Sequence, residues 1–292
     1  MLNKSKSENA YQIFIHIAVG IIVCASIFPL LYVLGMSLTT LGEMQRRNFF
    51  VIIPMEPTIE AYKRLLITDY IWRSLGVSIF RSLIGTLLLL CLTMTGAYVL
   101  ARKSLPGRKF FLFFILVTVL FNGGMIPTYL VVKQLGLTNS VWSLIIPMLV
   151  DSFGLLAIKV FIENLPDEII EAARIDGTGD FQLLIRIVFP LTIPSLAAIG
   201  MFNAVIHWNN WFDAMLYITN KTYYPFQLII RNMFSSGMSS LDSALTMKAS
   251  QRVSAETLRM AAVIFGIIPI LCVYPFLQKH FSKGMFIGSI KG

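Results

Sequence analysis

Residues whose types and spacing could support chemistry gather at two places in this chain of 292 residues. The first is the segment 163–186, where acids outnumber bases: Glu163, Asp167, Glu168, Glu171, Asp176 and Asp180 against Arg174 and Arg186. The second is a stripe with the helical spacing i, i+4, i+7, i+8, formed by Asn203, His207, Asn210 and Trp211. The chain has no Gly-x-x-x-x-Gly-Lys-Ser/Thr string for nucleotide phosphates and no His-Glu-x-x-His pair for a metal. We therefore expect no catalysis and no bound cofactor or metal in this chain.

The stripe suits a ligand rich in hydroxyl groups, such as a sugar. Amides can hydrogen-bond the hydroxyls, and an indole can contact the flat C–H faces of a sugar ring. Trp208 and Asn209 lie beside the stripe, and Asn122, followed by Gly123 and Gly124, is a further candidate for lining a cavity. The alternative is that these are interfacial aromatics and polar contacts between helices, which are common in membrane proteins.

Membrane-spanning helices must position these residues. The chain is 56% hydrophobic and 13% charged, whereas soluble domains are about 45–50% apolar and about 25% charged. At roughly 20 apolar residues per crossing, the sequence predicts an all-α chain. Its six spans are expected at 13–37, 78–101, 110–129, 141–161, 189–217 and 260–277. One transmembrane domain, 13–292, then follows a short N-terminal segment, 1–12. The first apolar run exceeds that of a signal peptide, so we expect a retained helix.

Basic residues in the connections orient these spans. They crowd the second connection and follow the last span without intervening acids: Arg102, Lys103, Arg108 and Lys109, then Lys279, Lys283 and Lys291. The positive-inside rule places both termini, and the tail 279–292, in the cytoplasm. The basic segment 218–259, expected outside, counts mildly against this orientation. The net charge of +9 favours an anionic membrane surface over nucleic acid, because the basic residues flank apolar segments.

Three ionisable residues lie in or near the spans. Arg81 and Asp213 are expected near the outer interface, where they could be hydrated, and Asp151 more centrally, in a paired structural role. A proton-driven carrier would need several central acids, and the sequence offers Asp151 alone.

The acidic segment is expected to form two short helices with a sharp break. Asn164 can cap the first helix, Ala172 and Ala173 leave a patch of small side chains, and Gly177 fits a left-handed helix stop. Thr178 can cap the second helix, whose amphipathic spacing is carried by Phe181, Leu184, Ile185 and Val188. A helical hairpin lying on the membrane surface would carry basic residues on its polar face. We therefore expect the loop 163–188 to dock against another chain instead.

This loop resembles the EAA loop of bacterial ATP-binding-cassette (ABC) importer permeases. The resemblance is carried by Glu171-Ala172-Ala173, Asp176-Gly177, Ile187 and Pro190-Leu191. In that family the loop forms coupling helices that sit in a cleft of a separate ATP-binding subunit. The resemblance implies an ATPase-coupling site made of Glu171, Ala172, Ala173, Asp176, Gly177 and Pro190. It also implies that Glu171 and Gly177 are contact or hinge residues.

Other parts of the chain resemble the carbohydrate-uptake permeases of the same family. The ending, Lys283-Gly284-Met285 and then Gly288-Ser289-Ile290-Lys291-Gly292, is similar to the tail of the second permease in such importers, the maltose system among them. Ser289 departs from the alanine more usual there. The run 121–127, from Phe121 to Pro127, looks most like permeases assigned to complex or polysaccharide-derived oligosaccharides.

The resemblance implies a multi-pass permease of a bacterial cell membrane that forms half of an oligosaccharide pathway. Its expected partners are a second homologous permease, an ATPase homodimer that carries ATP and Mg²⁺, an extracytoplasmic solute-binding protein and membrane lipid, but no nucleic acid. The expected pathway residues are Asn203, His207, Trp208, Asn210, Trp211 and Asn122. The alternatives are a permease for a non-sugar solute such as an amino acid or polyamine, an ion-coupled carrier, and a membrane-embedded enzyme.

Overall fold

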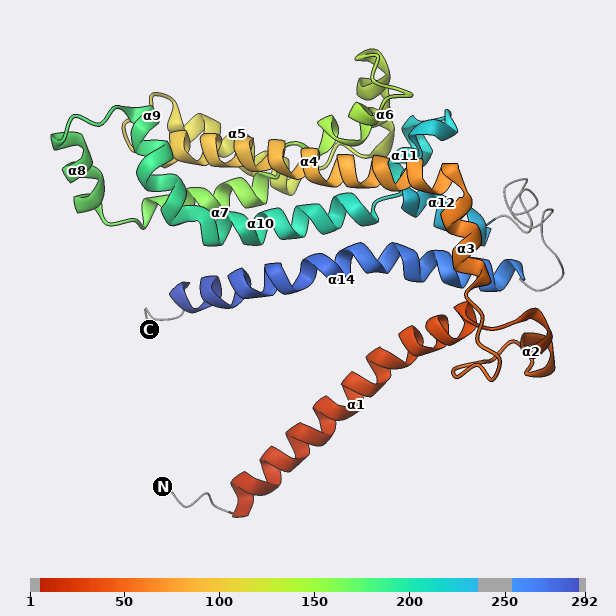
Figure 1. Ribbon diagram of the computed structural model, residues 1–292. Coiled ribbons are helices and arrows are strands. Elements are labelled where there is room, and N and C mark those ends of the chain that lie inside the picture. The colour runs from red at the N-terminus through yellow and green to blue at the C-terminus, as the bar shows by residue number, and fades with distance from the viewer. Residues whose placement is uncertain (1–5, 236–253, 289–292) are drawn as a thin grey trace. The chain divides into compact units, whose positions relative to one another are not determined.

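The computed structural model describes the backbone of residues 6–235 and 254–288 and the side chains of residues 11–235, 254–273 and 275. Every regular element in these ranges is helical, as expected for an all-α chain (Figure 1). The chain divides into two compact units, one of Met1–Asp69 with Asn232–Ile268 and one of Tyr70–Arg231 with Pro269–Gly292. The motif at 283–292 and residues 236–253 of the segment 218–259 lie outside the residues whose side chains are described.

Four helices of the described residues are long and apolar enough to cross a membrane: Tyr11–Ser37, Asp69–Ala101, Asp180–Asn209 and Ala255–Val273. Two further candidates are bent pairs of helices. The chain bends by 118° between α5 (Arg108–Leu120) and α6 (Met125–Gln134), and by 46° between Val141–Met148 and α7 (Ser152–Glu163). The expected third and fourth spans are therefore broken, and the total reaches six only if each bent pair is one span.

Local chemistry explains both breaks. After α5, the Asn122 side chain accepts the N–H of Gly124 at 2.8 Å, and Gly124 has a φ of 85°, which favours glycine. Alone, the 13 residues of α5 span about 20 Å, less than the roughly 30 Å hydrocarbon core. Before α7, the chain forms the short 3₁₀ helices η1 (Val141–Leu144) and η2 (Ile146–Met148), and Pro147 within η2 has no N–H with which to continue a regular helix. The Asp151 carboxylate then caps α7 by accepting the Gly154 N–H at 3.0 Å, so its predicted structural role is confirmed.

The first unit contains α1 (Lys6–Ser37), α2 (Leu41–Arg46), α3 (Glu60–Ile67) and the start of α14 (Ala255–Gly288). Most side chains of α1 are exposed within the chain, which leaves a long apolar helix surface for lipid or another subunit. A small core of Met36, Met44, Val51 and Met260 covers the end of α1. The unit thus packs around the last turns of α1 and not along its whole length.

The second unit holds both predicted sites. Figure 1 shows α8 (Asp167–Ile175) and α9 (Asp180–Leu183) at one end of α4 (Asp69–Ala101) and α10 (Phe189–Asn209), with α6 and α11 (Phe212–Tyr217) at the other. A core built from α4, α7, α8, α9 and α10 supports the first end, and one built from α6, η1, α11 and α12 (Phe226–Ser235) supports the second. The remaining elements are the π-helix η3 (Leu184–Val188) and the 3₁₀ helix η4 (Lys221–Tyr223).

Candidate functional site

The acidic loop contains the predicted sharp turn at Gly177. The φ of Gly177 is 77°, its N–H bonds the carbonyl of Arg174 at 3.0 Å, and the N–H of Thr178 bonds the carbonyl of Ala173 at 3.0 Å. These two bonds define a Schellman motif, which satisfies the last carbonyls of α8 and needs a left-handed residue where Gly177 stands. The predicted helix stop at Gly177 is confirmed.

Two predicted caps of this loop are wrong. Asn164 ends α7 and does not begin α8; its side-chain amide donates to the carbonyl of Val160 at 2.9 Å. The N-cap position of α8 is Pro166, which supplies no side-chain bond, and α9 begins after Gly179 and not after Thr178. The first turn of α8 instead carries Asp167 and Glu168, whose charges suit the positive end of the helix dipole.

The loop exposes both polar and apolar surface. Glu171, Ala172, Asp176 and Gly177 are exposed, and Ile175 is 86% exposed. Ala173 turns inward and is buried in the core beneath the loop. The expected small-residue patch is therefore divided, with Ala172 outward and Ala173 inward.

The amphipathic pattern expected for the second helix of the loop is only half right. Leu184 and Val188 are buried, whereas Phe181 and Ile185 are exposed. The reason is the π-helix η3, which has more residues per turn than an α-helix and so rotates the pattern.

Pro190 accounts for this π-helix. It lies in the first turn of α10, has no N–H for the carbonyl of residue 186, and its ring would clash in a regular α-turn. A wider turn just before it relieves both problems. The proline was visible in the sequence, but an i, i+3, i+4 pattern assumes an unbroken α-helix.

Arg102 ties α9 to the end of α4. Its guanidinium lies 2.6 Å and 2.8 Å from the two carboxylate oxygens of Asp180, and it donates to the Tyr98 hydroxyl at 2.7 Å. That hydroxyl donates to the Asp180 carbonyl at 3.1 Å. The Asp180 bond is the main reason that the pKa of Arg102 is raised. We call Tyr98, Arg102 and Asp180 the latch.

A second ionic group holds the end of α7. Glu163 pairs with Arg108, whose Nε also donates to the Leu100 carbonyl at 2.8 Å, and with Lys159 at 2.7 Å. An open pocket of about 270 Å³ lies beside both groups, lined by residues that include Tyr98, Arg102, Glu163 and Arg174. Polar links as well as apolar packing therefore hold the loop to α4 and α7. The sequence carried a signal for these links, since the basic second connection complements the acids of the loop.

Three members of the predicted pathway set are buried within the chain. Asn203 donates to the Asp151 carboxylate at 3.2 Å and to the Ile199 carbonyl at 3.0 Å. His207 is fully buried against Gly85, and both of its ring nitrogens lack a hydrogen bond to the described residues. Trp208 is 6% exposed. In this conformation these side chains face neighbouring helices.

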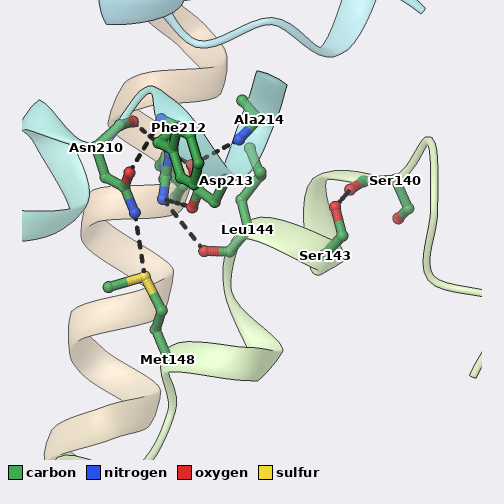
Figure 2. Close-up of polar contacts among 9 residues, drawn as sticks. Ser140, Ser143, Leu144, Met148, Asn210, Phe212, Asp213 and Ala214 are labelled. Carbon is green, nitrogen blue, oxygen red and sulfur yellow. Dashed lines mark hydrogen bonds and ion pairs between the residues drawn. The ribbon is translucent and has the colours of Figure 1, made fainter. Parts of the chain in front are cut away.

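The other members are more accessible. Asn210 ends α10, and its side-chain amide approaches the sulfur of Met148 at 3.6 Å (Figure 2). The Trp211 ring lies 4.9 Å from the Arg231 guanidinium carbon, a cation–π contact. Asn122 is exposed at the break after α5. The stripe is thus split between a buried half on α10 and an accessible half where α10 ends.

The expectation that Arg81 and Asp213 are hydrated is wrong. Arg81 is fully buried, and its two terminal nitrogens lie 3.2 Å and 2.5 Å from the two Asp213 carboxylate oxygens. The same guanidinium donates to the carbonyl of Asn210 at 2.9 Å and to that of Leu144 at 3.4 Å. Figure 2 shows Asn210, Asp213 and Leu144 gathered at this point. A guanidinium without water needs such acceptors, because an unpaired buried charge is strongly destabilising.

These features define a class of protein. The described residues contain no group of three or more His, Cys, Asp or Glu able to hold a metal ion. They form several apolar helices long enough for a membrane, with one exposed helix–turn–helix loop held by ion pairs. This is the architecture of a polytopic membrane protein with an exposed helical loop.

Comparison with known proteins identifies the family. Residues 104–287 match the family described as binding-protein-dependent transport system inner membrane component. The chain is 40% identical over 268 residues to the polygalacturonan/rhamnogalacturonan transport system permease protein YtcP of Bacillus subtilis, covering 91% of this chain and 93% of that one. It is also 40% identical to Protein LplC of Bacillus subtilis, over 100% of this chain and 98% of that one.

A solved structure agrees over nearly the whole length. A chain of a bacterial ABC transporter involved in the import of the acidic polysaccharide alginate matches with a TM-score of 0.88 and 29% identity, covering 96% of this chain and all of that one. The chain therefore belongs to the binding-protein-dependent transport system inner membrane component family. It is a permease subunit of an ABC importer, and ATP hydrolysis belongs to a separate subunit. The predicted all-α fold and the predicted family are confirmed.

Proposed function

We propose that this chain forms half of the translocation pathway of an oligosaccharide importer in a bacterial cell membrane. A second homologous permease forms the other half, a homodimeric ATPase binds ATP and Mg²⁺ below, and an extracytoplasmic solute-binding protein delivers the sugar. Both termini then lie in the cytoplasm, on the side of the ATPase. The family supports this assembly, since its description names a binding-protein-dependent system.

The observation that carries the coupling role is the exposed turn of the loop 163–188. Glu171, Ala172, Asp176 and Gly177 are all exposed around a single Schellman turn, whereas ion pairs tie the two ends of the loop to the end of α4 and the start of α5. A surface of this kind can transmit a movement of the ATPase to α4 and α10 without unfolding. Together with Ala173 beneath and Pro190 at the start of α10, these residues make up the proposed coupling site.

The proposed substrate is an oligosaccharide that carries uronate groups. The relative at 40% identity is named for polygalacturonan and rhamnogalacturonan, and the structure at 29% identity for the acidic polysaccharide alginate. Relatives named for arabinooligosaccharides are 24% and 25% identical. Neutral oligosaccharides are therefore the second candidate class.

The proposed pathway begins at the accessible half of the stripe. Asn210, Trp211 and Asn122 offer amide donors and an aromatic surface, and Arg231 places a positive charge against Trp211. Asn203, His207 and Trp208 would meet substrate only after α10 separates from α4 or α7. Alternating access, in which one set of helices moves against another, provides such a separation.

The test is a reconstituted importer in lipid nanodiscs, assembled with the permease, ATPase and binding protein from the same genetic locus. ATPase stimulation is measured with oligogalacturonates and with neutral arabino-oligosaccharides of matched length. We expect at least tenfold greater stimulation per mole by the uronates. Stimulation by the neutral sugars alone would reject the uronate assignment, and stimulation by neither, with an amino acid or polyamine active instead, would reject the oligosaccharide.

A further inference from the structure

The loop that follows α2, residues 47–55, presents apolar side chains that the transport function leaves unused. Phe49, Phe50, Ile53 and Met55 are each more than half exposed, with Ile53 at 78% and Met55 at 76%. We call these four side chains the apolar wedge. Val51, which lies between them, is fully buried in the core at the end of α1. The loop is therefore a folded part of the first unit.

Its backbone is held in an unfavourable conformation at Phe49. Asn48 and Phe49 have φ values of 53° and 62°, in the left-handed region that a bulky residue such as phenylalanine rarely adopts. Such a conformation persists only where its surroundings enforce it. Here the Phe49 N–H bonds the Met44 carbonyl at 2.9 Å, and the Tyr32 hydroxyl donates to the Phe49 carbonyl at 3.2 Å.

Glu43 and Arg47 fix the rest of the loop. The buried Glu43 carboxylate accepts the N–H of Met55 at 2.8 Å and that of Glu56 at 3.2 Å. Arg47 donates to the Ile53 carbonyl at 2.9 Å and lies 3.3 Å from the same carboxylate. A charged network therefore sets the shape of the loop, and this shape turns the wedge outward.

Contacts with α1 also fix the position of the loop along that helix. In Figure 1, α2 lies beside the C-terminal end of α1. The Phe50 ring stacks on Tyr32 with 5.4 Å between ring centroids. At Gly35 the loop backbone lies directly on α1, because a Cβ there would sit 2.1 Å from the Ile52 carbonyl oxygen.

That depth corresponds to the edge of a membrane. Tyr32 and Gly35 belong to the apolar segment Tyr11–Ser37, which has 27 residues. At about 1.5 Å per residue this segment spans roughly 40 Å, more than the roughly 30 Å hydrocarbon core. Its last turns, and the loop fixed against them, therefore reach the headgroup region.

We propose that the apolar wedge is a membrane-interface anchor that inserts among phospholipid acyl chains just beneath the headgroups. Lipid fits better than a protein partner, because the helix beside the wedge exposes apolar side chains up to Leu34, and the loop contacts that helix through Phe50 on Tyr32 and the Ile52 carbonyl at Gly35. Exposed Arg46 precedes the wedge, and a basic residue beside apolar ones is typical of segments that lie in the interface and face headgroup phosphates. The strained, clamped backbone keeps the wedge in place while other parts of an importer move.

The test uses the whole importer in membranes of producing cells, with the photoreactive residue p-benzoylphenylalanine placed at Ile53 or, separately, at Met55. Gln45, an exposed polar position on α2, serves as the matched control site. After irradiation, mass spectrometry of the purified chain measures adducts of phospholipid and of protein. We expect phospholipid adducts at Ile53 and Met55 at least fivefold above those at Gln45.

A protein adduct that dominates at both wedge positions would replace the lipid assignment with a docking surface for that protein. Lipid adducts no more frequent than at Gln45 would also overturn it. Two independent positions protect the result against one variant that fails to assemble. Neither outcome depends on which solute the importer carries, so this experiment tests the membrane anchor independently of the proposed function.

Discussion

Arg81 and Asp213, separated by 132 positions in sequence, form a two-point ion pair between α4 and α11. The Arg81 side chain is fully buried, and its guanidinium also donates to the carbonyls of Leu144 and Asn210. One side chain thus joins α4, the end of η1 and the break between α10 and α11. The accessible half of the predicted stripe is built on this junction.

Asp213→Asn is expected to destabilise the subunit strongly. Removing one partner leaves a buried charge without compensation, which typically costs about 3–5 kcal/mol. The thermal unfolding midpoint of the purified importer in nanodiscs measures the effect. The double variant Arg81→Met with Asp213→Leu should recover most of the loss, because two apolar groups remove both charges. An unchanged midpoint in Asp213→Asn would contradict the pairing.

Gly85→Ala should also destabilise the unit, because His207 occupies the space where a side chain would start. A Cβ at Gly85 would lie 2.7 Å from the His207 ring, whereas one at Gly76 on the same helix meets nothing within 4 Å. Overpacking of this kind costs roughly 1–3 kcal/mol, and Gly76→Ala should be neutral or stabilising by up to about 1 kcal/mol. Thermal unfolding of both variants makes the comparison, and His207→Ala should rescue Gly85→Ala. Equal effects at the two glycines would show that His207 does not fill this space.

Some of this structure could be predicted from the sequence because it depends on local chemistry. The stop at Gly177 follows from the freedom of glycine to adopt a positive φ, and the apolar segments follow from the thickness of a bilayer. The cap by Asp151 is equally local, although the sequence favoured a paired structural role for that residue and not a cap. Each of these features is decided by a few consecutive residues.

The remainder depends on contacts between distant residues. The burial of Arg81 requires Asp213 to come back from 132 positions away, and the latch requires Asp180 to meet Arg102 across 78 positions. The exposure of Phe181 depends on the π-helix that Pro190 induces, which breaks the assumed period. The periodicity of a sequence does not show which distant residue pairs with a charge. It therefore could not predict whether these side chains point inward or outward.

Gly177→Ala is expected to impair coupling, whereas Gly179→Ala is not. The φ of Gly177 is 77° and that of Gly179 is −69°, and a Cβ at either position meets no atom within 4 Å. The difference between the variants therefore isolates backbone strain, which costs a non-glycine residue roughly 1–2 kcal/mol in the left-handed region. Sugar-stimulated ATPase activity of the reconstituted importer should fall several-fold in Gly177→Ala alone.

Two stronger changes test the docking surface itself. Gly177→Pro removes the N–H that closes the turn on Arg174, and Glu171→Lys reverses an exposed charge. Both should abolish the stimulation while the complex still purifies with its ATPase at reduced yield. Full stimulation in both variants would remove the coupling role from this loop.

Arg102→Ala tests whether the latch transmits motion. Its partner Asp180 is 64% exposed, and an ion pair open to solvent contributes little to stability, so the unfolding midpoint should barely move. The ratio of sugar transported to ATP hydrolysed should fall severalfold, because α9 would no longer follow α4. Lys109→Ala, which removes an exposed basic residue nearby, is the control and should keep the wild-type ratio. A wild-type ratio in Arg102→Ala as well would assign the latch to structure alone.

The Glu43 clamp should make the loop after α2 sensitive to acid. Hydrogen bonds from the Met55 and Glu56 N–H groups, and the nearby arginines, lower the pKa of Glu43 below its ordinary value of 4.5 despite burial. Because the folded pKa lies below the unfolded one, the stabilisation is fully present above the unfolded pKa and is lost as pH falls through the folded pKa.

Glu43→Gln removes this contribution at every pH. The difference in unfolding midpoint between wild type and Glu43→Gln should therefore be constant from pH 8 to about pH 6, and should shrink as the pH falls below about 4.5. Glu56→Gln removes an exposed charge just after this loop and controls for net charge. A difference that persists unchanged down to pH 3, or that grows as the pH falls, would show that the ionised carboxylate does not hold the loop.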